Sequence, residues 1–114
     1  MNNQALFDQL IAAYDDNDTE IFLNLLTDDF EWEMMGDQLI KGKAGVQELF
    51  RQLEGNFRII SNEWEYKLCQ EDKAAANGIT IAEEDGVMVK RLFCNMYQFK
   101  EGKLWRMKSY TIKK

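Results

Sequence analysis

The sequence predicts an α+β fold in which helices cover one face of a curved antiparallel sheet. Helical periodicity is confined to the first half of the chain, and β-type runs fill the second half. The last two runs, Val87 to Phe99 and Leu104 to Ile112, are long and are joined by a tight polar turn. Helices grouped before strands are typical of α+β folds. With 114 residues, the chain is expected to be one domain, 1–114, that buries its own core.

Three helices are expected before the sheet. Apolar residues recur at helical spacing from Leu6 to Tyr14, with acidic residues on the opposite side. Asn17 followed by Glu20 has the form of a capping box and predicts the start of a short second helix. A third helix is expected over 46–53, ending at a glycine.

Five strands are expected. Residues 30–34 alternate apolar and charged side chains, which indicates a short strand with one buried face. The glycine-punctuated segment 36–45 predicts a loop. Strands are then predicted over 57–69 and 74–82, and Asp85-Gly86 signals a turn into the final hairpin.

Composition excludes several classes of function. The net charge is −6, and no basic cluster is interleaved with aromatic residues, so no nucleic-acid partner is expected. No stretch approaches the ~18 apolar residues of a membrane span, and the N-terminus lacks a basic segment followed by an apolar one. We therefore expect a cytoplasmic protein that does not bind membranes.

The chain contains no histidine. This excludes a Ser-His-Asp or Cys-His nucleophile and removes the commonest ligand of zinc, copper and iron. Cys69 and Cys94 have no CxxC spacing and are interpreted as small apolar residues. We expect no metal and no cofactor, so any chemistry would depend on carboxylate, phenol, amide, hydroxyl or lysine groups.

Both faces of the run 87–99 are mainly apolar. The face that includes Phe93 and Asn95 is expected to point toward the helices, which makes Asn95 the polar side chain most directly placed in an enclosed apolar space. The other face also needs cover, and a second copy of the chain is the economical source. We predict a homodimer packed through the outer sheet face. Its expected contacts are Trp64, Leu92, Cys94 and Met96.

The order of elements resembles the SnoaL-like branch of the NTF2-like superfamily. The resemblance also rests on Gly36, on the segment 42–46 running into Leu49-Phe50, and on the ending 99–110. It spans almost the whole chain and implies a cone, in which a strongly bent sheet wraps around three helices and leaves an apolar pocket at its open end. The superfamily includes polyketide cyclases, ketosteroid isomerase, dehydratases, hydrolases and non-catalytic modules, so the resemblance predicts fold better than activity.

Ketosteroid isomerase supplies the comparison for the site. It uses an aspartate base, and a tyrosine with a protonated aspartic acid that hold the developing oxyanion. The resemblance places Tyr14 at the tyrosine and Asn95 at the protonated acid, but puts Met34 where the base should be. Ser109 occupies the other position where SnoaL-like proteins often carry an acid. Asp37, near the expected mouth, is then the remaining candidate base.

The implied pocket combines these polar residues with large apolar ones. Its expected lining is Tyr14, Trp32, Met34, Phe50, Phe93, Asn95, Met107 and Ser109. Arg91 is expected near the rim, where it would pair with Glu33 or Asp37, bind an anionic ligand, or turn out to solvent at a β-bulge.

Three functions stay open at this point. The first is binding of a small, largely apolar molecule, with Tyr14 and Asn95 holding a carbonyl or hydroxyl group. The second is a lyase, isomerase or cyclase that acts next to a carbonyl with Asp37 as base. The third is a non-catalytic dimerisation or assembly module with a filled cone.

Overall fold

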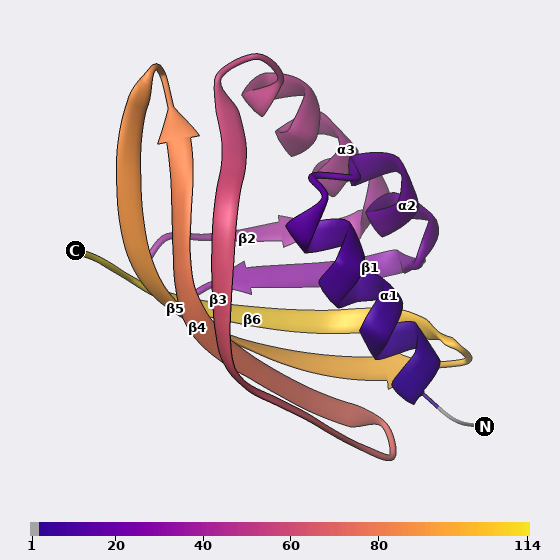
Figure 1. Ribbon diagram of the computed structural model, residues 1–114. Coiled ribbons are helices and arrows are strands. Elements are labelled where there is room, and N and C mark those ends of the chain that lie inside the picture. Colours follow the sequence, from indigo (N-terminus) through magenta and orange to yellow (C-terminus); the bar gives the residue numbers. More distant parts are fainter. Residues whose placement is uncertain (1–2) are drawn as a thin grey trace.

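The computed structural model describes residues 3–114 and contains three helices and six strands (Figure 1). The elements are α1 (Gln4–Asp15), α2 (Thr19–Asn24), β1 (Leu26–Met34), β2 (Gln38–Lys41), α3 (Gly42–Leu53), β3 (Phe57–Gln70), β4 (Lys73–Glu84), β5 (Val87–Lys100) and β6 (Lys103–Lys113). No helix within 3–114 has the length and apolar character needed to span a membrane.

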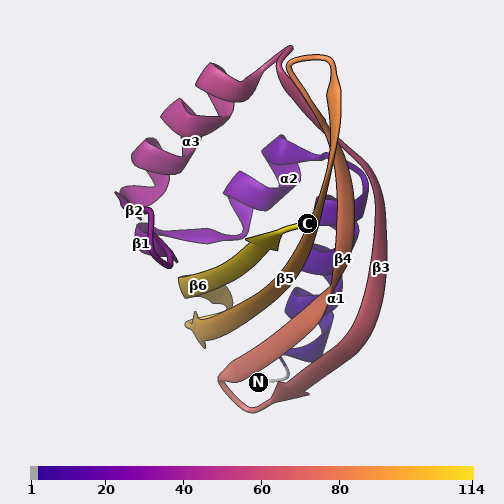
Figure 2. The ribbon, with the colours of Figure 1, turned by 90° about the vertical axis from the view of Figure 1, so that its left-hand side faces the viewer.

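The six strands form one curved sheet in the order β2-β1-β6-β5-β4-β3. Figure 2 shows the long strands β3, β4 and β5 bending around the side on which the helices lie. The predicted α+β class and curved sheet are confirmed, but the sheet is mixed and not wholly antiparallel. The reason is that β6 is inserted beside β1 and runs parallel to it, with Trp32 opposite Met107.

The segment predicted as a loop over 36–45 contains β2. This four-residue strand pairs antiparallel with β1, so that Trp32 lies opposite Ile40. Gly36 and Gly42, which flank it, both have the positive φ that favours glycine. The strand is too short to show a clear alternation of apolar and polar residues. The glycines around it were therefore the stronger signal, and they predicted a loop.

The predicted capping box at Asn17 is wrong. Asp18 is the N-cap of α2, and its carboxylate accepts a hydrogen bond from the backbone N–H of Ile21 at 3.1 Å. Asn17 instead has a φ of 55° and bonds to the backbone of Ile59 in β3. An asparagine tolerates this left-handed conformation, so the residue can turn the chain between two helices while its side chain reaches the sheet.

Gly78 in β4 allows the close approach of β3. A Cβ atom at this position would clash with the carbonyl oxygen of Glu63 and lie 3.0 Å from the Cα of Trp64. The register of β3 against β4 also shifts twice, between Ile59 and Ser61 and between Trp64 and Tyr66. Such bulges bend a strand and increase its twist, so they contribute to the curvature of the sheet.

The core lies between the helices and the inner face of the sheet, and we call the end of that face beside the β5–β6 turn the closed end. Phe7, Leu26, Phe30, Val46 and Leu104 are the largest side chains of the core that are fully buried. Along β5 the predicted alternation is observed, because Val89, Phe93, Asn95, Tyr97 and Phe99 are buried whereas Met96 is exposed. The inner face of β5 therefore runs from the closed end at Phe99 to the opposite, open end at Arg91.

Candidate functional site

The buried polar residues of the described chain are Thr80, Asn95 and Ser109. All three lie on the inner face of the sheet, where Asn95 of β5 is directly opposite Ser109 of β6 and Thr80 of β4 is opposite Arg91. None of the three carries a charge at neutral pH. The inner face is thus polar at a few positions without being ionic.

Asn95 and Ser109 each make a side-chain hydrogen bond to an aromatic neighbour. The Asn95 Nδ2 donates to the Tyr97 hydroxyl at 3.3 Å, and the Trp32 Nε1 donates to the Ser109 Oγ at 2.8 Å. Burial raises the pKa of Tyr97, and the hydrogen bond from Asn95 opposes this rise only in part. Tyr97 is therefore a neutral phenol, and Asn95 a neutral amide held in a fixed orientation.

Tyr14 reaches the same face from the last turn of α1. Its ring packs against Trp64 at 5.6 Å and Phe93 at 5.8 Å between ring centroids, and the nearby Thr80 hydroxyl donates to the Ser61 carbonyl at 3.5 Å. Burial raises the pKa of Tyr14; the nearby Thr80 side chain lowers it by less, the Asp15 charge raises it further, and the Arg91 charge lowers it. Tyr14 is accordingly a protonated phenol that can donate a hydrogen bond.

Two aromatic groups flank the polar pair Asn95 and Ser109. The first aromatic cluster is Tyr14, Trp64 and Phe93, whose Trp64–Phe93 centroid distance is 5.1 Å. The second aromatic cluster is Phe22, Trp32 and Phe50, in which the Phe22 ring lies 6.1 Å from Trp32 and 5.8 Å from Phe50. Phe93 is two residues from Asn95 and Trp32 bonds to Ser109, so each cluster adjoins one member of the pair.

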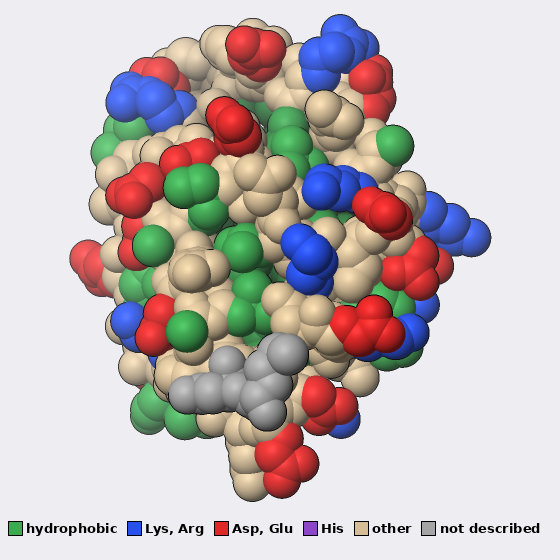
Figure 3. Space-filling model, turned by 90° about the vertical axis from the view of Figure 1, so that its right-hand side faces the viewer, with side chains coloured by type: hydrophobic (Ala, Val, Ile, Leu, Met, Phe, Trp, Pro, Cys, Tyr) green, Lys and Arg blue, Asp and Glu red, His purple; other side chains and the backbone are tan. Residues whose placement is uncertain are grey.

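Several inward-facing aromatic side chains are less completely buried than the core. Tyr14, Trp32, Phe50 and Trp64 all point inward yet are only partly buried, in contrast to Phe7 and Phe30. Viewed from the side of the helices, hydrophobic side chains are visible between charged ones (Figure 3). These four side chains are therefore inward-facing aromatic groups that keep part of their surface exposed.

Residues 7–107 match the model of the SnoaL-like domain. The chain belongs to the SnoaL-like family. No curated protein matches its sequence.

Among solved structures, this SnoaL-like protein is similar to an LEH-like epoxide hydrolase of Mycobacterium tuberculosis, with 15% identity, 92% of this chain and 78% of that chain covered, and a TM-score of 0.80. It is also similar to a candidate SnoaL-like polyketide cyclase of Mesorhizobium loti, with 14% identity, 96% of this chain and 99% of that chain covered, and a TM-score of 0.81. An NTF2-like protein of unknown function from Cytophaga hutchinsonii gives 17% identity, 97% and 100% coverage, and a TM-score of 0.78. At these identities the likeness shows a shared fold.

The two methionines of the expected pocket lie on the inner face. Met34 is partly buried opposite Ser109, and Met107 is buried opposite Tyr97. A thioether does not take up a proton at neutral pH, so Met34 brings apolar surface, and no base, to this part of the inner face. Ser109 accepts the Trp32 N–H, and the sequence offers no histidine to activate its hydroxyl.

The structure places Asp37 apart from the inner polar residues. It is exposed in the turn between β1 and β2, where its backbone N–H donates to the Met34 carbonyl at 3.0 Å. Within residues 3–114 its carboxylate makes no hydrogen bond to Tyr14 or Asn95. No cluster of three or more metal-binding side chains is found in the same range.

Two other carboxylates bond to inward-facing groups. Asp15 accepts from the Trp64 Nε1 at 2.9 Å and from the Asn62 Nδ2 at 2.8 Å. Glu84 forms a two-point ion pair with Arg91, in which the Arg91 Nη2 lies 3.0 Å from the Glu84 Oε1. The expected pairing of Arg91 with Glu33 or Asp37 is therefore wrong, because the β4–β5 register places Glu84 on the same face and closer to Arg91.

Sequence reasoning missed Thr80, Tyr97, Asp15 and Glu84 as neighbours of the site. The inward alternation of β5 could have indicated Tyr97, which is two residues from Asn95. The same alternation in β4 could have indicated Thr80, because alternate positions from Ala74 to Ala82 are buried. The partners of Asp15 and Glu84 depend on how distant segments pack, so no local pattern in the sequence indicates them.

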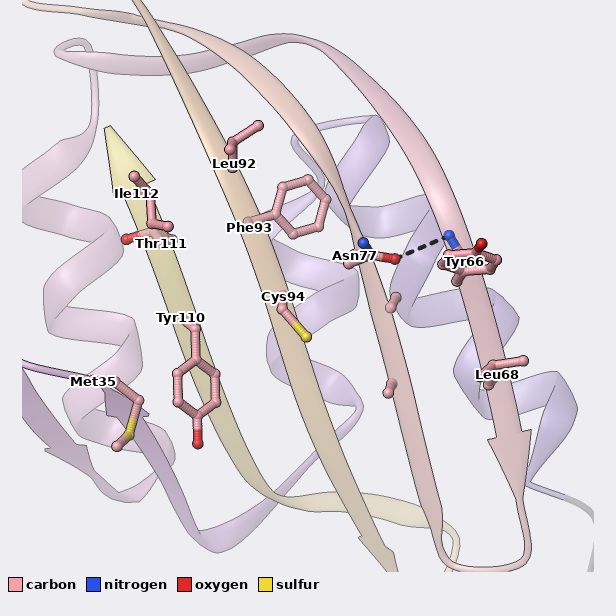
Figure 4. A pocket seen from close by; sticks show the side chains of 12 residues that line it. Met35, Tyr66, Leu68, Asn77, Leu92, Phe93, Cys94, Tyr110, Thr111 and Ile112 are labelled. Atoms are coloured by element: carbon pink, nitrogen blue, oxygen red, sulfur yellow. Dashed lines mark hydrogen bonds between the residues drawn. The ribbon is translucent and has the colours of Figure 1, made fainter. Parts of the chain in front are cut away.

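The outer face of the sheet carries an open pocket of about 590 Å³ (Figure 4). Its lining includes Met35, Tyr66, Leu92, Cys94, Tyr110 and Ile112. A second, smaller hollow of about 310 Å³ lies beside Trp105 and Arg106. Neither of these two hollows includes Tyr14 or Asn95.

Trp64, expected on the outer face, points inward instead, because the bulges of β3 shift its alternation.

Proposed function

We propose that this SnoaL-like protein binds a small, largely apolar molecule with a carbonyl or hydroxyl group at the open end of its inner face, without a catalytic carboxylate. The observation that carries the proposal is that the buried polar residues of the described chain, Thr80, Asn95 and Ser109, are all neutral and all face inward. Apolar pockets with a few convergent polar groups are typical of small-molecule sites.

Asn95 and Tyr14 are the proposed hydrogen-bond donors. The Asn95 amide has two N–H groups, and Tyr97 accepts one of them, which leaves the second for an oxygen atom of the ligand. The Tyr14 hydroxyl, which burial keeps protonated, donates to the same oxygen atom of the ligand. The two aromatic clusters cover the apolar part of the ligand. Apart from the buried Phe93, their members are only partly buried and leave surface to be buried on binding.

A lyase, isomerase or cyclase that acts next to a carbonyl is the second candidate. The resemblance of the fold to a candidate polyketide cyclase favours it. In this mechanism Tyr14 and Asn95 would stabilise the enolate, and Asp37 would be the base. It requires the β1–β2 turn to bring Asp37 toward the inner face, so substitution of Asp37 separates this candidate from simple binding.

The test is a thermal-shift screen with small ketones, lactones and aromatic alcohols, followed by titration of the compounds that stabilise the protein. We expect Tyr14→Phe and Asn95→Ser to weaken binding about tenfold each, because each loses one desolvated hydrogen bond. Tyr110→Phe, on the outer face, is the matched control and should bind as the wild type does.

Three results would decide between the candidates. Equal affinity in all three variants would contradict the proposed donors. Turnover of a bound ketone or lactone that is lost in Asp37→Asn would favour the enzyme. Absence of any stabilising compound would favour the filled-cone assembly module and contradict the binding proposal.

We also propose that the outer face pairs with a second copy of the chain. Tyr66, Leu68 and Ile112 expose 62%, 65% and 66% of their surfaces there, next to Leu92 and Cys94. Exposed apolar area of this kind is typical of protein interfaces. Trp64 points inward and is therefore removed from the proposed dimer contacts. Leu92, Cys94 and Met96 lie on the outer face and stay among them. The cytoplasmic location stays a prediction.

A further inference from the structure

We propose that Arg91 makes the inner site selective for ligands that carry a carboxylate at the end opposite to their carbonyl or hydroxyl group. This inference rests on the proposed function and names the class of ligand: a small aromatic or aliphatic acid with a neutral polar group at its far end. The juxtaposition that supports it is the inward row of β5, from Arg91 through Phe93 to Asn95.

The row has the dimensions of a small elongated molecule. Arg91 and Asn95 are four residues apart on one face of a strand, which corresponds to roughly 13 Å between their Cα atoms. Phe93 lies between them, buried beneath Tyr14 and Trp64 of the first aromatic cluster. A ligand along this row would therefore place its apolar body against the partly exposed rings of Tyr14 and Trp64, with one polar end at Asn95 and the other at Arg91.

Arg91 is suited to bind a carboxylate. Its side chain is only 26% exposed, and its guanidinium already makes a two-point contact with the carboxylate of Glu84. Two-point contacts of this kind are the strong and geometrically specific form of carboxylate recognition by arginine. Glu84 thus occupies the position that the carboxylate of a ligand would take.

A second cation allows Glu84 to release Arg91. Lys113 of β6 lies opposite Arg91, and its charge acts on Glu84 in addition to the larger effect of Arg91 itself. Arg91 and Lys113 thus face one carboxylate, that of Glu84. When the carboxylate of a ligand binds Arg91, Glu84 keeps Lys113 as its partner and the charges balance. Asp15, the other acid near Tyr14, is exposed and already bonded to Asn62 and Trp64.

The experiment compares two probes of the same shape by calorimetric titration: 4-(4-hydroxyphenyl)butanoate and its primary amide. We expect the wild type to bind the acid about tenfold more tightly than the amide, which is the range of a charge-assisted hydrogen bond. Arg91→Gln should remove this preference, because it weakens binding of the acid about tenfold more than binding of the amide. Glu84→Gln should raise the affinity for the acid, because Arg91 no longer has a charged competitor.

Arg58→Gln is the matched control, since Arg58 is an exposed arginine that pairs with Glu83, the residue next to Glu84. It should leave both affinities unchanged. Arg91→Lys keeps the charge but loses the planar fork, and should retain only part of the preference. Circular dichroism of each variant checks that it folds.

The possible failures are distinguishable. If the amide binds through Tyr14 and Asn95 while the acid gains nothing, or if Arg91→Gln keeps the preference, this inference is overturned and the proposed function stands. A lower affinity for the acid in Glu84→Gln also overturns it. If neither probe binds, both proposals are contradicted for this class of ligand.

Discussion

The side chain of Asn17 occupies both backbone hydrogen-bonding groups of Ile59. Its Nδ2 donates to the Ile59 carbonyl at 2.9 Å, and its Oδ1 accepts the Ile59 N–H at 2.8 Å. Ile59 belongs to β3, an edge strand of the sheet, so one amide side chain here takes the place of a neighbouring strand. This pair ties the turn between α1 and α2 to the sheet and positions Tyr14, three residues earlier, over the inner face.

Asn17→Ala is expected to lower the free energy of unfolding by about 2 to 3 kcal/mol, because two partly buried backbone groups lose their partners and alanine is strained at positive φ. Asn17→Gly relieves the strain but still lacks the bonds, so it should lose about 1 kcal/mol less. Urea denaturation measures both. Wild-type stability in the glycine variant would mean that the two bonds contribute nothing.

Gly78→Ala is expected to destabilise the protein by about 3 kcal/mol or more, because the added methyl group meets the backbone of β3 and not a movable side chain. Gly36→Ala is the control. It has positive φ but no atom near its added methyl group, so only backbone strain of about 1 to 2 kcal/mol is expected. Thermal unfolding of the two variants should therefore give clearly different midpoints, and equal midpoints would show that β3 can move away.

The buried phenol of Tyr97 predicts a loss of stability at high pH. Burial raises its pKa in the folded state above the ordinary value of 10.0. Below that value both states keep the proton; above it the unfolded chain loses the proton first, so stability falls as pH rises, by up to roughly 1.4 kcal/mol per pH unit. Tyr97→Phe should be less stable near neutral pH, since the Asn95 amide loses its acceptor, but should show a shallower alkaline decline.

Urea denaturation of the wild type and Tyr97→Phe between about pH 8 and about pH 11 measures this difference, because the window spans the ordinary tyrosine pKa. Tyr14, whose pKa is also raised by burial, keeps part of the decline in the variant. Parallel curves for the two proteins would contradict the role given to Tyr97.

The proposed pairing of outer faces predicts a particle of twice the 13.4 kDa chain mass in light scattering at micromolar concentration. Leu92→Arg should give monomers, because it places an unpaired charge in the apolar outer face. Ile21→Arg, an exposed apolar residue of α2 on the helical side, should remain dimeric. A monomeric wild type would contradict the proposal.

The parts of the fold that the sequence predicts well are those with regular register. Strand β5 pairs with β4 without a shift, so its alternation correctly puts Phe93 and Asn95 on the inner face. Strand β3 contains two bulges, each of which reverses the alternation, and Trp64 therefore lies inward. Bulges arise from packing between distant segments, and a local pattern does not contain that information.

Within the candidate site, too, some features were indicated by the sequence and others were not. Tyr14 and Ser109 lie on the inner face, and their roles in the site stay predictions. The pairing of Arg91 depended on the exact register of β4 against β5, which the sequence did not reveal. The sequence also did not predict that β6 is the parallel neighbour of β1, because the contact between Leu26 and Leu104 joins segments far apart in the chain.

That contact has a consequence for how the molecule assembles. β6 is the last strand in the sequence but lies between β1 and β5, so the part of the sheet made by β1 and β2 joins the part made by β3, β4 and β5 only through it. Contacts between such distant residues slow folding, since a long loop must close before they form. During synthesis the two parts of the sheet must wait for the final strand, and a chain cut after β5 would expose the unpaired edges of both.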